Sequence, residues 1–351
     1  MNERLNRRNG MERKTGFIYW LVLTLCVIAT FLISASIGKY EISIPDILST
    51  IYYHFSDPSK ITDLNMETTL LNIRLPRLIT VMIVGAGLSI AGSAYQGMFR
   101  NPLVSPDILG ASSGAAFGAC LAMLVGMNNF MVQFIAFLMG LGAVTVASTV
   151  TKKMSQDPII SLVLGGIMVS TLCESGISLV KLVADADNEL PQITFWLMGG
   201  FNTINKDKMV TILLPMLLGF VLLFLSRWQL NVLSFGEGEA RSMGIKTSQV
   251  RLVVIFASTL ITASSVSVCG LVGWVGLVIP HIGRALSGPN FVKLIPTCAL
   301  VGAIFLMGVD DVARCAFDVE LPIGILTSFI GVPFFYIIYR YNRGGNANGN
   351  S

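Results

Sequence analysis

Few residues of this chain have the types and the spacing that catalysis requires. The only Gly-Lys pair, Gly38-Lys39, lacks both the upstream glycine and the following serine or threonine of a phosphate-binding loop. The two histidines, His54 and His281, are far apart in the sequence and have no metal-ligand spacing. We expect His281, which follows a proline, to satisfy backbone groups freed at a helix end. These patterns predict that the chain is not an enzyme and binds no metal or other cofactor.

Glu174 and Lys181 share one face of an expected apolar helix. Such a pair within a membrane could relay protons or ions. The long side chain of Lys181 can instead extend to the membrane surface, and we favour that interpretation. The cysteines lie in apolar runs without Cys-x-x-Cys spacing, which favours buried thiols over disulfides or metal ligands: Cys26, Cys120, Cys173, Cys269, Cys298 and Cys315.

The composition indicates a membrane protein with several helical spans. Of the 351 residues, 53% are hydrophobic and 13% are charged, and the mean hydropathy is +0.72. The charged share is about half that of a soluble domain. We therefore predict an all-α polytopic membrane protein that is embedded in a lipid bilayer and binds no nucleic acid.

Ten apolar runs are long enough, or nearly so, to cross a bilayer as helices. They cover about 17–37, 76–96, 108–126, 129–150, 158–183, 209–226, 250–272, 273–286, 291–309 and 321–339. We also expect a short amphipathic surface helix over 45–55 and a half-inserted or interfacial segment over 193–201.

We expect a polar, basic leader over 1–15, a single transmembrane domain over 16–342 and a disordered cytoplasmic tail over 343–351. A cleavable signal peptide is an alternative for the N-terminus, but the first apolar run is long for such a peptide.

The distribution of charge predicts that both termini lie in the cytoplasm. In that orientation the cytoplasmic segments hold 16 of the 24 Lys and Arg residues, and the opposite segments hold 13 of the 20 carboxylates. An excess of basic residues on the cytoplasmic side is the rule for helical membrane proteins.

Three arginines oppose that rule, because Arg74, Arg77 and Arg314 fall on the extracytoplasmic side. The first two also stand at the expected N-terminus of the second span, where the helix dipole repels cations. One interpretation is anchoring to lipid headgroups, with an i, i+4 pair between Asp310 and Arg314. The other is a basic docking site for a carboxylate-bearing partner, where these side chains would face water.

Two further patterns have a structural or binding interpretation. The segment 236–248 alternates glutamate and arginine between glycines, which favours a short helix that docks on a cytoplasmic protein. Gly110, Gly114 and Gly118 recur every four residues along one helical stripe, and small residues at that spacing let two membrane helices approach closely.

Five segments in chain order resemble the FecCD family of importer permeases for iron-siderophores, haem and vitamin B12. They are RLPR at 74–77, RNPLVSPDILG at 100–110, GEGEARSMGI at 236–245, GWVGLVIPHIGR at 273–284, and ELPIG at 320–324 with GVPFF at 331–335. The resemblance extends from the first expected span to the tenth.

The resemblance implies a ten-helix fold like that of the vitamin B12 importer permease, a type II ABC importer, in a bacterial or archaeal cytoplasmic membrane. It implies a second permease copy, identical or not, and an extracytoplasmic substrate-binding protein. Two cytoplasmic ATPase subunits would hold ATP and magnesium.

The resemblance also implies roles for particular residues. Arg74, Arg77 and Arg314 match arginines that meet glutamates on the binding protein, and Asn101 and Leu103 match positions that close the pathway at its cytoplasmic end. The segment that couples to the ATPase comprises Glu237, Glu239, Ala240, Arg241, Ser242 and Gly244. The chain departs from the family at Gly238, where a glutamate is common.

We therefore expect the permease subunit of an ATP-driven importer for an iron-siderophore or a related metal chelate, with haem or vitamin B12 as alternatives. An ion-coupled secondary transporter is the rival from another class, and it would need several intramembrane carboxylates around a midplane site. Only Glu174 is a candidate for such a carboxylate. A membrane enzyme is disfavoured because the chain lacks a catalytic constellation.

Overall fold

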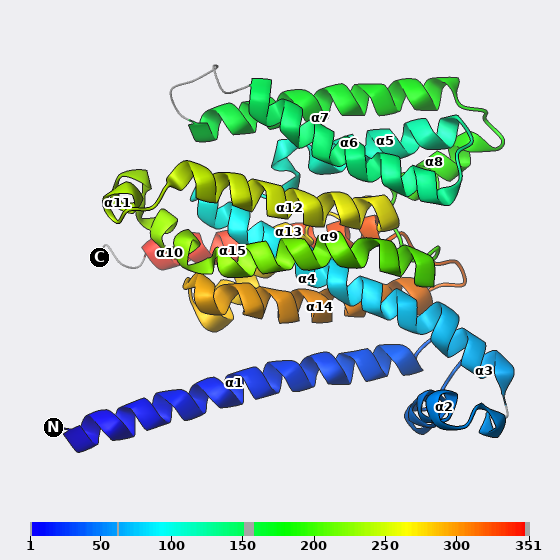
Figure 1. Cartoon of the computed structure of the whole chain (residues 1–351), viewed down its shortest axis with the longest axis horizontal. Coiled ribbons are helices and arrows are strands. Elements are labelled where there is room, and N and C mark those ends of the chain that lie inside the picture. The colour runs from blue at the N-terminus through cyan, green and yellow to red at the C-terminus, as the bar shows by residue number, and fades with distance from the viewer. Residues whose placement is uncertain (1, 62, 151–157, 348–351) are drawn as a thin grey trace.

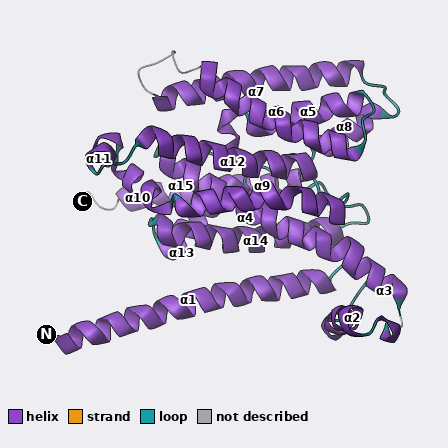
Figure 2. Cartoon of the chain, in the orientation of Figure 1, coloured by secondary structure: helices purple, strands orange, loops and turns teal. Residues whose placement is uncertain are grey.

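The computed structural model describes residues 2–61, 63–150 and 158–347, and within these ranges the regular elements are all helices (Figure 2). Most of the helices run side by side along one axis (Figure 1). At one end of this bundle lie α10 (Arg227–Phe235) and α11 (Glu237–Ser242), and at the other lie α2 (Ile44–Ser56) and α3 (Leu64–Thr68). We call these the α11 end and the α2 end.

Seven helices are long and apolar enough to cross a membrane by length and composition, and three shorter apolar helices accompany them. The ten coincide with the ten predicted spans, since each lies within or overlaps one of them. They are α1 (Asn2–Ser36), α4 (Leu75–Phe99, continuous with α3), α5 (Ala111–Leu124), α6 (Asn129–Val150), α7 (Pro158–Val183), α9 (Lys206–Leu225), α12 (Thr247–Cys269), α13 (Val275–Ser287), α14 (Phe291–Cys315) and α15 (Ile323–Ala347).

The helices form three groups across the bundle (Figure 1). The central group contains α4, α9, α12, α13, α14 and α15, and it is flanked on one side by α5 to α8 and on the other by α1. Within the most apolar 18-residue stretch of each helix, 78% of the residues are buried in the span that contains α4 and 83% in α12. In the corresponding stretch of α1 no residue is buried. The first two helices therefore form the core, and α1 exposes its apolar side chains, as a helix surrounded by lipid would.

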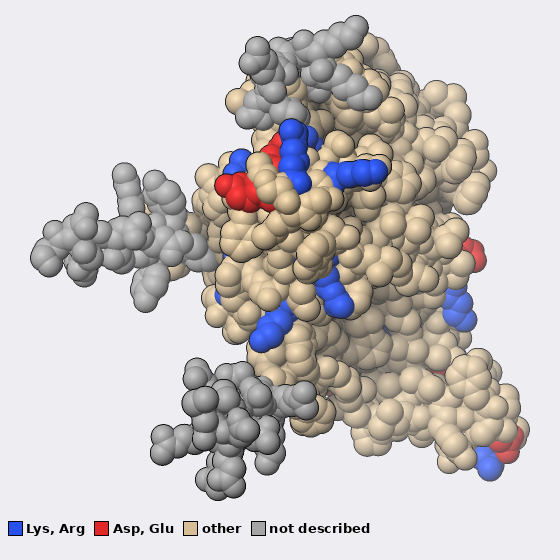
Figure 3. All heavy atoms as spheres, turned by 60° about the vertical axis from the view of Figure 1, so that its left-hand side comes forward, with Lys and Arg blue, Asp and Glu red and all other residues tan. Residues whose placement is uncertain are grey.

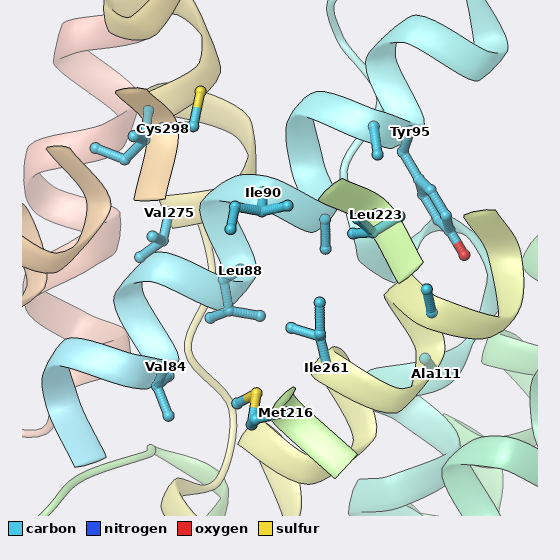
Figure 4. Packing of buried hydrophobic residues seen from close by; sticks show 14 of the residues in the cluster. Val84, Leu88, Ile90, Tyr95, Ala111, Met216, Leu223, Ile261, Val275 and Cys298 are labelled. Atoms are coloured by element: carbon cyan, nitrogen blue, oxygen red, sulfur yellow. The ribbon is translucent and has the colours of Figure 1, made fainter. Parts of the chain in front are cut away.

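The core depends on side chains of α4, α9 and α12 that turn toward one another, with Leu88, Leu223 and Ile261 near its centre (Figure 4). Glycines on α4 let neighbouring helices come close. A Cβ added at Gly92 would lie 1.8 Å from the carbonyl oxygen of Gly276 in α13, and one added at Gly85 would lie 2.4 Å from that of Gly302 in α14. These contacts hold α4 against two helices at van der Waals distance.

The second span begins earlier than predicted. The helix starts at Leu64 as α3, continues through a π-helical turn (Thr69–Arg74) and runs on as α4 to Phe99. The start predicted at residue 76 is therefore wrong, because Pro76 occupies the first turn of α4 without interrupting the ladder that precedes it. Asp63 caps the new start by accepting from the backbone N–H groups of Asn65 and Met66 at 2.9 and 3.0 Å.

Other boundaries also differ from the sequence-based expectation. The short segment expected over 193–201 is α8 (Glu189–Leu197), four residues earlier. The third span begins at Ala111, after a 3₁₀ turn over Pro106–Leu109. Helix α15 continues to Ala347, so 343–347 is helical where a disordered tail was expected, and 348–351 lie outside the described residues.

Two smaller predictions have mixed outcomes. The amphipathic helix expected over 45–55 is confirmed as α2, which buries Ile47 and Thr50 and exposes Tyr52 and Phe55. No disulfide is present among the described residues, and four of the six thiols are buried, but Cys26 and Cys315 are exposed. Cys26 lies on the lipid-type face of α1, and Cys315 ends α14, so neither is enclosed by neighbouring helices.

We predict that Gly92→Ala destabilises the protein by about 1–3 kcal/mol, because the added methyl group would force α4 and α13 apart. Unfolding of the detergent-solubilised protein by heat or denaturant measures the change. Gly142→Ala on α6 is the matched control, since a Cβ there meets nothing within 4 Å. The control should be neutral or gain up to about 1 kcal/mol from helix propensity. Equal stability of the two variants would contradict the close contact.

Candidate functional site

A buried ion network joins α4 to α14 at the α2 end. Its centre is Asp310, whose side chain has no exposed surface. Arg77 Nη2 lies 2.9 Å from Asp310 Oδ1, and Arg314 Nε lies 3.3 Å from Asp310 Oδ2. Arg77 also pairs with Glu320 at 3.0 Å, and Arg314 with Asp311. A buried carboxylate is stable only when it is paired, and here two guanidinium groups share that task.

Arg314 and a third arginine, Arg74, bind the C-terminal end of α1 and the chain just beyond it. Arg74 donates to the carbonyl oxygens of Ala35 at 2.6 Å and Tyr40 at 2.7 Å. Arg314 donates to those of Ser34 at 3.0 Å and Ile37 at 3.2 Å. The last carbonyls of a helix have no partner within it and carry the negative end of its dipole. Cationic donors at this position therefore satisfy the orphan acceptors and stabilise α1.

The sequence-based account of these arginines needs correction. Their side chains are 5%, 7% and 8% exposed, so the expectation that Arg74, Arg77 and Arg314 face water is wrong. The dipole argument is also wrong, because the helix begins ten residues before Arg74 and both α1 and α14 present C-terminal ends to the cluster. The predicted i, i+4 pair between Asp310 and Arg314 is confirmed. Docking of a partner on these residues remains a prediction.

The network borders two cavities at the α2 end. Arg314 lines one of about 1010 Å³, together with charged residues of the α1–α2 connection, of the first turn of α2 and of the segment after α14: Lys39, Glu41, Asp46 and Asp318. Arg77 and Glu320 line another of about 470 Å³. The small exposed fraction of the two arginines is therefore reachable from the α2 end.

The turn predicted to close the pathway lies at the α11 end. Arg100 ends α4 in the left-handed conformation, with φ of 51°, and Asn101 Oδ1 accepts from the backbone N–H of Leu103 at 2.9 Å. Leu103 is 56% exposed, so its side chain projects from the turn. Asn101 therefore shapes the turn while Leu103 is available to meet another surface.

His281 of α13 fixes this turn, a contact that sequence reasoning missed. Its Nε2 lies 3.1 Å from the carbonyl oxygen of Pro102, so the ring must donate. The expectation that His281 satisfies a backbone group is confirmed, but the acceptor belongs to a distant turn rather than to a helix end nearby. Gln96 accepts from Arg284 at 2.7 Å and adds a second polar link between α4 and α13.

Helix α11 is confirmed as a short helix after Gly236, whose φ of 131° favours glycine. Its exposed face carries Glu239, Arg241 and Ser242, followed by Met243 and Gly244. Figure 3 brings the α11 end forward and shows acidic and basic side chains gathered there on a mostly uncharged surface.

The other two coupling residues face inward or pair within the chain. Ala240 is fully buried in a cluster with Val232, Leu233 and Ile245, and Glu237 pairs with Arg241 and Arg251. These contacts hold α11 against α10 and α12. At Gly238 an added Cβ would meet nothing within 4 Å, so the departure from the family pattern leaves the exposed face of α11 sterically open.

Two of the three glycines in the predicted stripe lie against one helix. Added Cβ atoms at Gly114 and Gly118 would meet Ala143 and Met139 of α6 at 2.4 and 2.7 Å. Gly110 instead precedes α5 with φ of +84° and faces Ser170 of α7. The close approach of α5 and α6 thus rests on Gly114 and Gly118, and Gly110 serves a left-handed turn.

The possible relay residues do not meet. Glu174 Oε1 lies 3.5 Å from the hydroxyl of Ser113, and no ion pair joins it to Lys181 within the described part of α7. Likewise, the described residues contain no group of three or more His, Cys, Asp or Glu side chains that could hold a metal ion.

Residues 25–341 match the model of the FecCD transport family. The chain belongs to the FecCD transport family. It is 40% identical over 328 residues to the molybdate import system permease protein MolB of Haemophilus influenzae, covering 92% of this chain and 96% of that relative. It is also 32% identical over 341 residues to the Fe(3+)-citrate import system permease protein YfmE of Bacillus subtilis, covering 95% and 98%.

Structural similarity agrees with this membership. A solved structure described as an inward-facing conformation of a metal-chelate type ABC transporter matches with a TM-score of 0.83 and 38% identity, covering 93% of this chain and 99% of that one. The FecCD chain thus has the predicted all-α fold of a type II ABC importer permease. It is a multi-pass membrane protein and a transport subunit of the ABC class.

We predict that Asp310→Asn destabilises the protein by about 3–5 kcal/mol, because removing one charge of a buried cluster leaves the remaining charges uncompensated. Asp318→Asn is the control, since Asp318 is exposed and its described contact uses the backbone carbonyl. The control should change stability by less than about 0.5 kcal/mol. Denaturant unfolding in detergent measures both, and a loss no larger in Asp310→Asn would refute the network's structural role.

Proposed function

We propose that this chain is the permease subunit of an ATP-driven importer that takes up an iron-siderophore or a related metal chelate. The observation that carries the proposal is the family match over 25–341, combined with an exposed charged helix, α11, at one end of the bundle and an arginine cluster at the other. Import through such a subunit requires one face for the energy source and one for ligand delivery.

The relatives support a metal-containing cargo. YfmE is named for ferric citrate, and the similar solved structure is described as a metal-chelate type transporter. Haem and vitamin B12 are alternatives, since relatives named for haemin and cobalamin transport also match. Molybdate is a second candidate, because the relative at 40% identity is named for molybdate import.

The proposed assembly has a second permease copy, two cytoplasmic ATPase subunits that hold ATP and magnesium, and an extracytoplasmic binding protein. It lies in the cytoplasmic membrane with both termini and the α11 end in the cytoplasm. The α2 end then faces outward, in agreement with the charge distribution of the sequence.

In this proposal α11 transmits force from the ATPase. Its inner side packs through Ala240 and Glu237 onto α10 and α12, so that movement of the ATPase surface would move these helices together. The turn with Asn101 and Leu103 closes the pathway at the same end, and the bond from His281 to Pro102 ties that turn to α13. The closed ATPases would bind one of the two states of the pathway more tightly than the other, and their closure would therefore favour that state.

Docking of the binding protein would use the arginine cluster at the α2 end. Arg77 and Arg314 line the two cavities there, but Asp310, Asp311 and Glu320 already pair with them. A carboxylate from the partner would therefore have to displace an internal one. Glu320 is the replaceable competitor, since it is 36% exposed and stands on the loop after α14, whereas Asp310 is enclosed.

An ion-coupled secondary transporter remains less favoured. It would require intramembrane carboxylates that are free to bind and release a coupling ion. Asp310, the fully buried carboxylate of α14, is held by two arginines, and Glu174 lies on α7 at 3.5 Å from a serine.

We predict that Glu239→Lys and Arg241→Glu lower ATP-driven uptake about 10-fold or more, as loss of a charge-assisted contact of roughly 1.5–3 kcal/mol implies. Membrane insertion should be unchanged, because both side chains are exposed. The measurements are copurification of an ATPase and uptake of radioactive ferric citrate or molybdate into proteoliposomes with a binding protein. Lys206→Glu is the control, because it reverses an exposed charge at the α2 end, away from the surface proposed to meet the ATPase. Unchanged uptake and copurification in both α11 variants would contradict the coupling role.

We also predict that Glu320→Gln raises the affinity of the assembled transporter for its binding protein, because a neutral amide competes for Arg77 less strongly than a carboxylate does. The gain should be several-fold, since a hydrogen bond to a charged group contributes about 1.5–3 kcal/mol and the competitor is partly exposed. Surface plasmon resonance in nanodiscs without cargo measures it, with Asp187→Asn as the control, since Asp187 is exposed and lines neither cavity. Unchanged or weaker binding in Glu320→Gln would count against docking at Arg77.

A further inference from the structure

The cavity of about 470 Å³ at the α2 end contains charge that the docking proposal does not use. Its walls are the ends of α5, α6, α8, α9 and α12, the first turn of α4 at Arg77, and the segments 199–203 and 320–323. Three of its side chains are charged: Arg77, Lys208 and Glu320. Arg77 is bound by two carboxylates, and Glu320 is one of them, so these two largely neutralise each other.

Lys208 is the uncompensated charge of this cavity. It lies in the first turn of α9, where Asn205 caps the helix by accepting from the Lys208 backbone N–H at 2.9 Å. Its Nζ donates to the hydroxyl of Thr203 at 3.0 Å, and among the described residues no carboxylate lies within ion-pair distance of it. The half-buried ammonium therefore has donor capacity left, and the cavity is where an acceptor can reach it.

Gln133 of α6 adds a second unsatisfied donor. It is 9% exposed and lines the same cavity. Its Oε1 lies 3.3 Å from the hydroxyl of Thr211, which leaves its amide N–H groups without a partner in the described part of the chain. The amide nitrogen of Gln133 retains accessible surface, so an acceptor in the cavity can take its hydrogens.

We infer that this cavity is an oxyanion-binding site for the cargo, with Lys208 and Gln133 as the recognising residues. The inference rests on the proposed importer function and names the chemistry of its cargo: a negatively charged oxygen group, either on a free oxyanion or on a carboxylate of a metal chelate. Lys208 supplies a compact charge with several donors, and Gln133 supplies neutral donors that fix the orientation of the group. Glu320, on the same wall, pairs with Arg77, which leaves Lys208 as the uncompensated cation that the anion meets.

Binding at this site would be weak enough for the cargo to pass on. One uncompensated lysine and one amide give a modest affinity, and the remaining volume holds water or the rest of a chelate. A transport pathway requires such a balance, since a ligand held tightly in one state would not leave it.

The test uses the assembled permease and ATPase in nanodiscs without a binding protein, and measures equilibrium binding of radioactive molybdate and, separately, of radioactive ferric citrate. We expect Lys208→Gln to weaken binding about 10-fold or more, as removal of a hydrogen bond to a charged group implies. Lys208→Arg should retain most of the affinity because it keeps the charge. Lys206→Gln is the matched control, since Lys206 is exposed on the same turn and does not line the cavity.

The outcomes separate the site from the proposed function. Saturable binding of either probe that is lost in Lys208→Gln and kept in Lys206→Gln supports the inference, and the probe that binds distinguishes a free oxyanion from a chelate. Equal affinity in Lys208→Gln and the parent, or equal losses in both glutamine variants, overturns it. If an ATPase copurifies but neither probe binds, the site is wrong and the importer function stands. If no ATPase copurifies, the proposed function itself fails.

Discussion

The structure depends on keeping one buried carboxylate, that of Asp310, neutralised at the α2 end. Two guanidinium groups, from Arg77 on α4 and Arg314 on α14, approach it within about 3 Å, and each has a second duty. Arg314 also donates to a carbonyl oxygen at the end of α1, and Arg77 also forms an ion pair with Glu320. A few charges thus stabilise the C-terminal ends of α1 and α14 and the loop after α14. A change in any one of them alters the environment of all the others, because charges in a protein interior are weakly screened.

Helix α4 connects this buried ion network to the turn at the α11 end of the molecule. It runs without a break from Arg77 to the turn after Phe99, and its glycines place its backbone against α13 and α14. At its far end, Gln96 and the Pro102 carbonyl are bound by residues of α13. A closely packed helix with polar anchors at both ends moves as a rigid element rather than by bending.

Much of the fold could be predicted from the sequence, and the reasons for success and failure are physical. Apolar runs locate spans because a bilayer demands them, so the ten helices were found. Hydropathy does not locate a helix that continues beyond the apolar run, and the polar residues Asn65, Glu67 and Asn72 concealed the true start of the second span. That single error inverted the argument about the helix dipole at Arg74 and Arg77. The exposed face of α11 followed from local charge alternation, whereas the Arg77–Asp310 pair, the His281–Pro102 bond and the Lys208–Gln133 cavity join residues far apart in the chain. No local spacing encodes such contacts.

The π-helical turn over Thr69–Arg74 has a consequence for how this region tolerates insertion and deletion. A π turn contains one residue more than an α-helical turn, and each residue of an α-helix advances the side chains by about 100°. The turn therefore sets the rotation of α3 relative to the face that α4 presents to the core. Deleting one residue there would let the ladder close as regular α-helix, but it would displace Leu70, which is buried with Ile42 and Ile47, or Arg74, which binds the carbonyl oxygens of Ala35 and Tyr40. The same deletion would rotate α3 by roughly 100° about its own axis relative to α4, so the π turn is what lets α3 and the membrane-spanning helix each keep the face that its neighbours require.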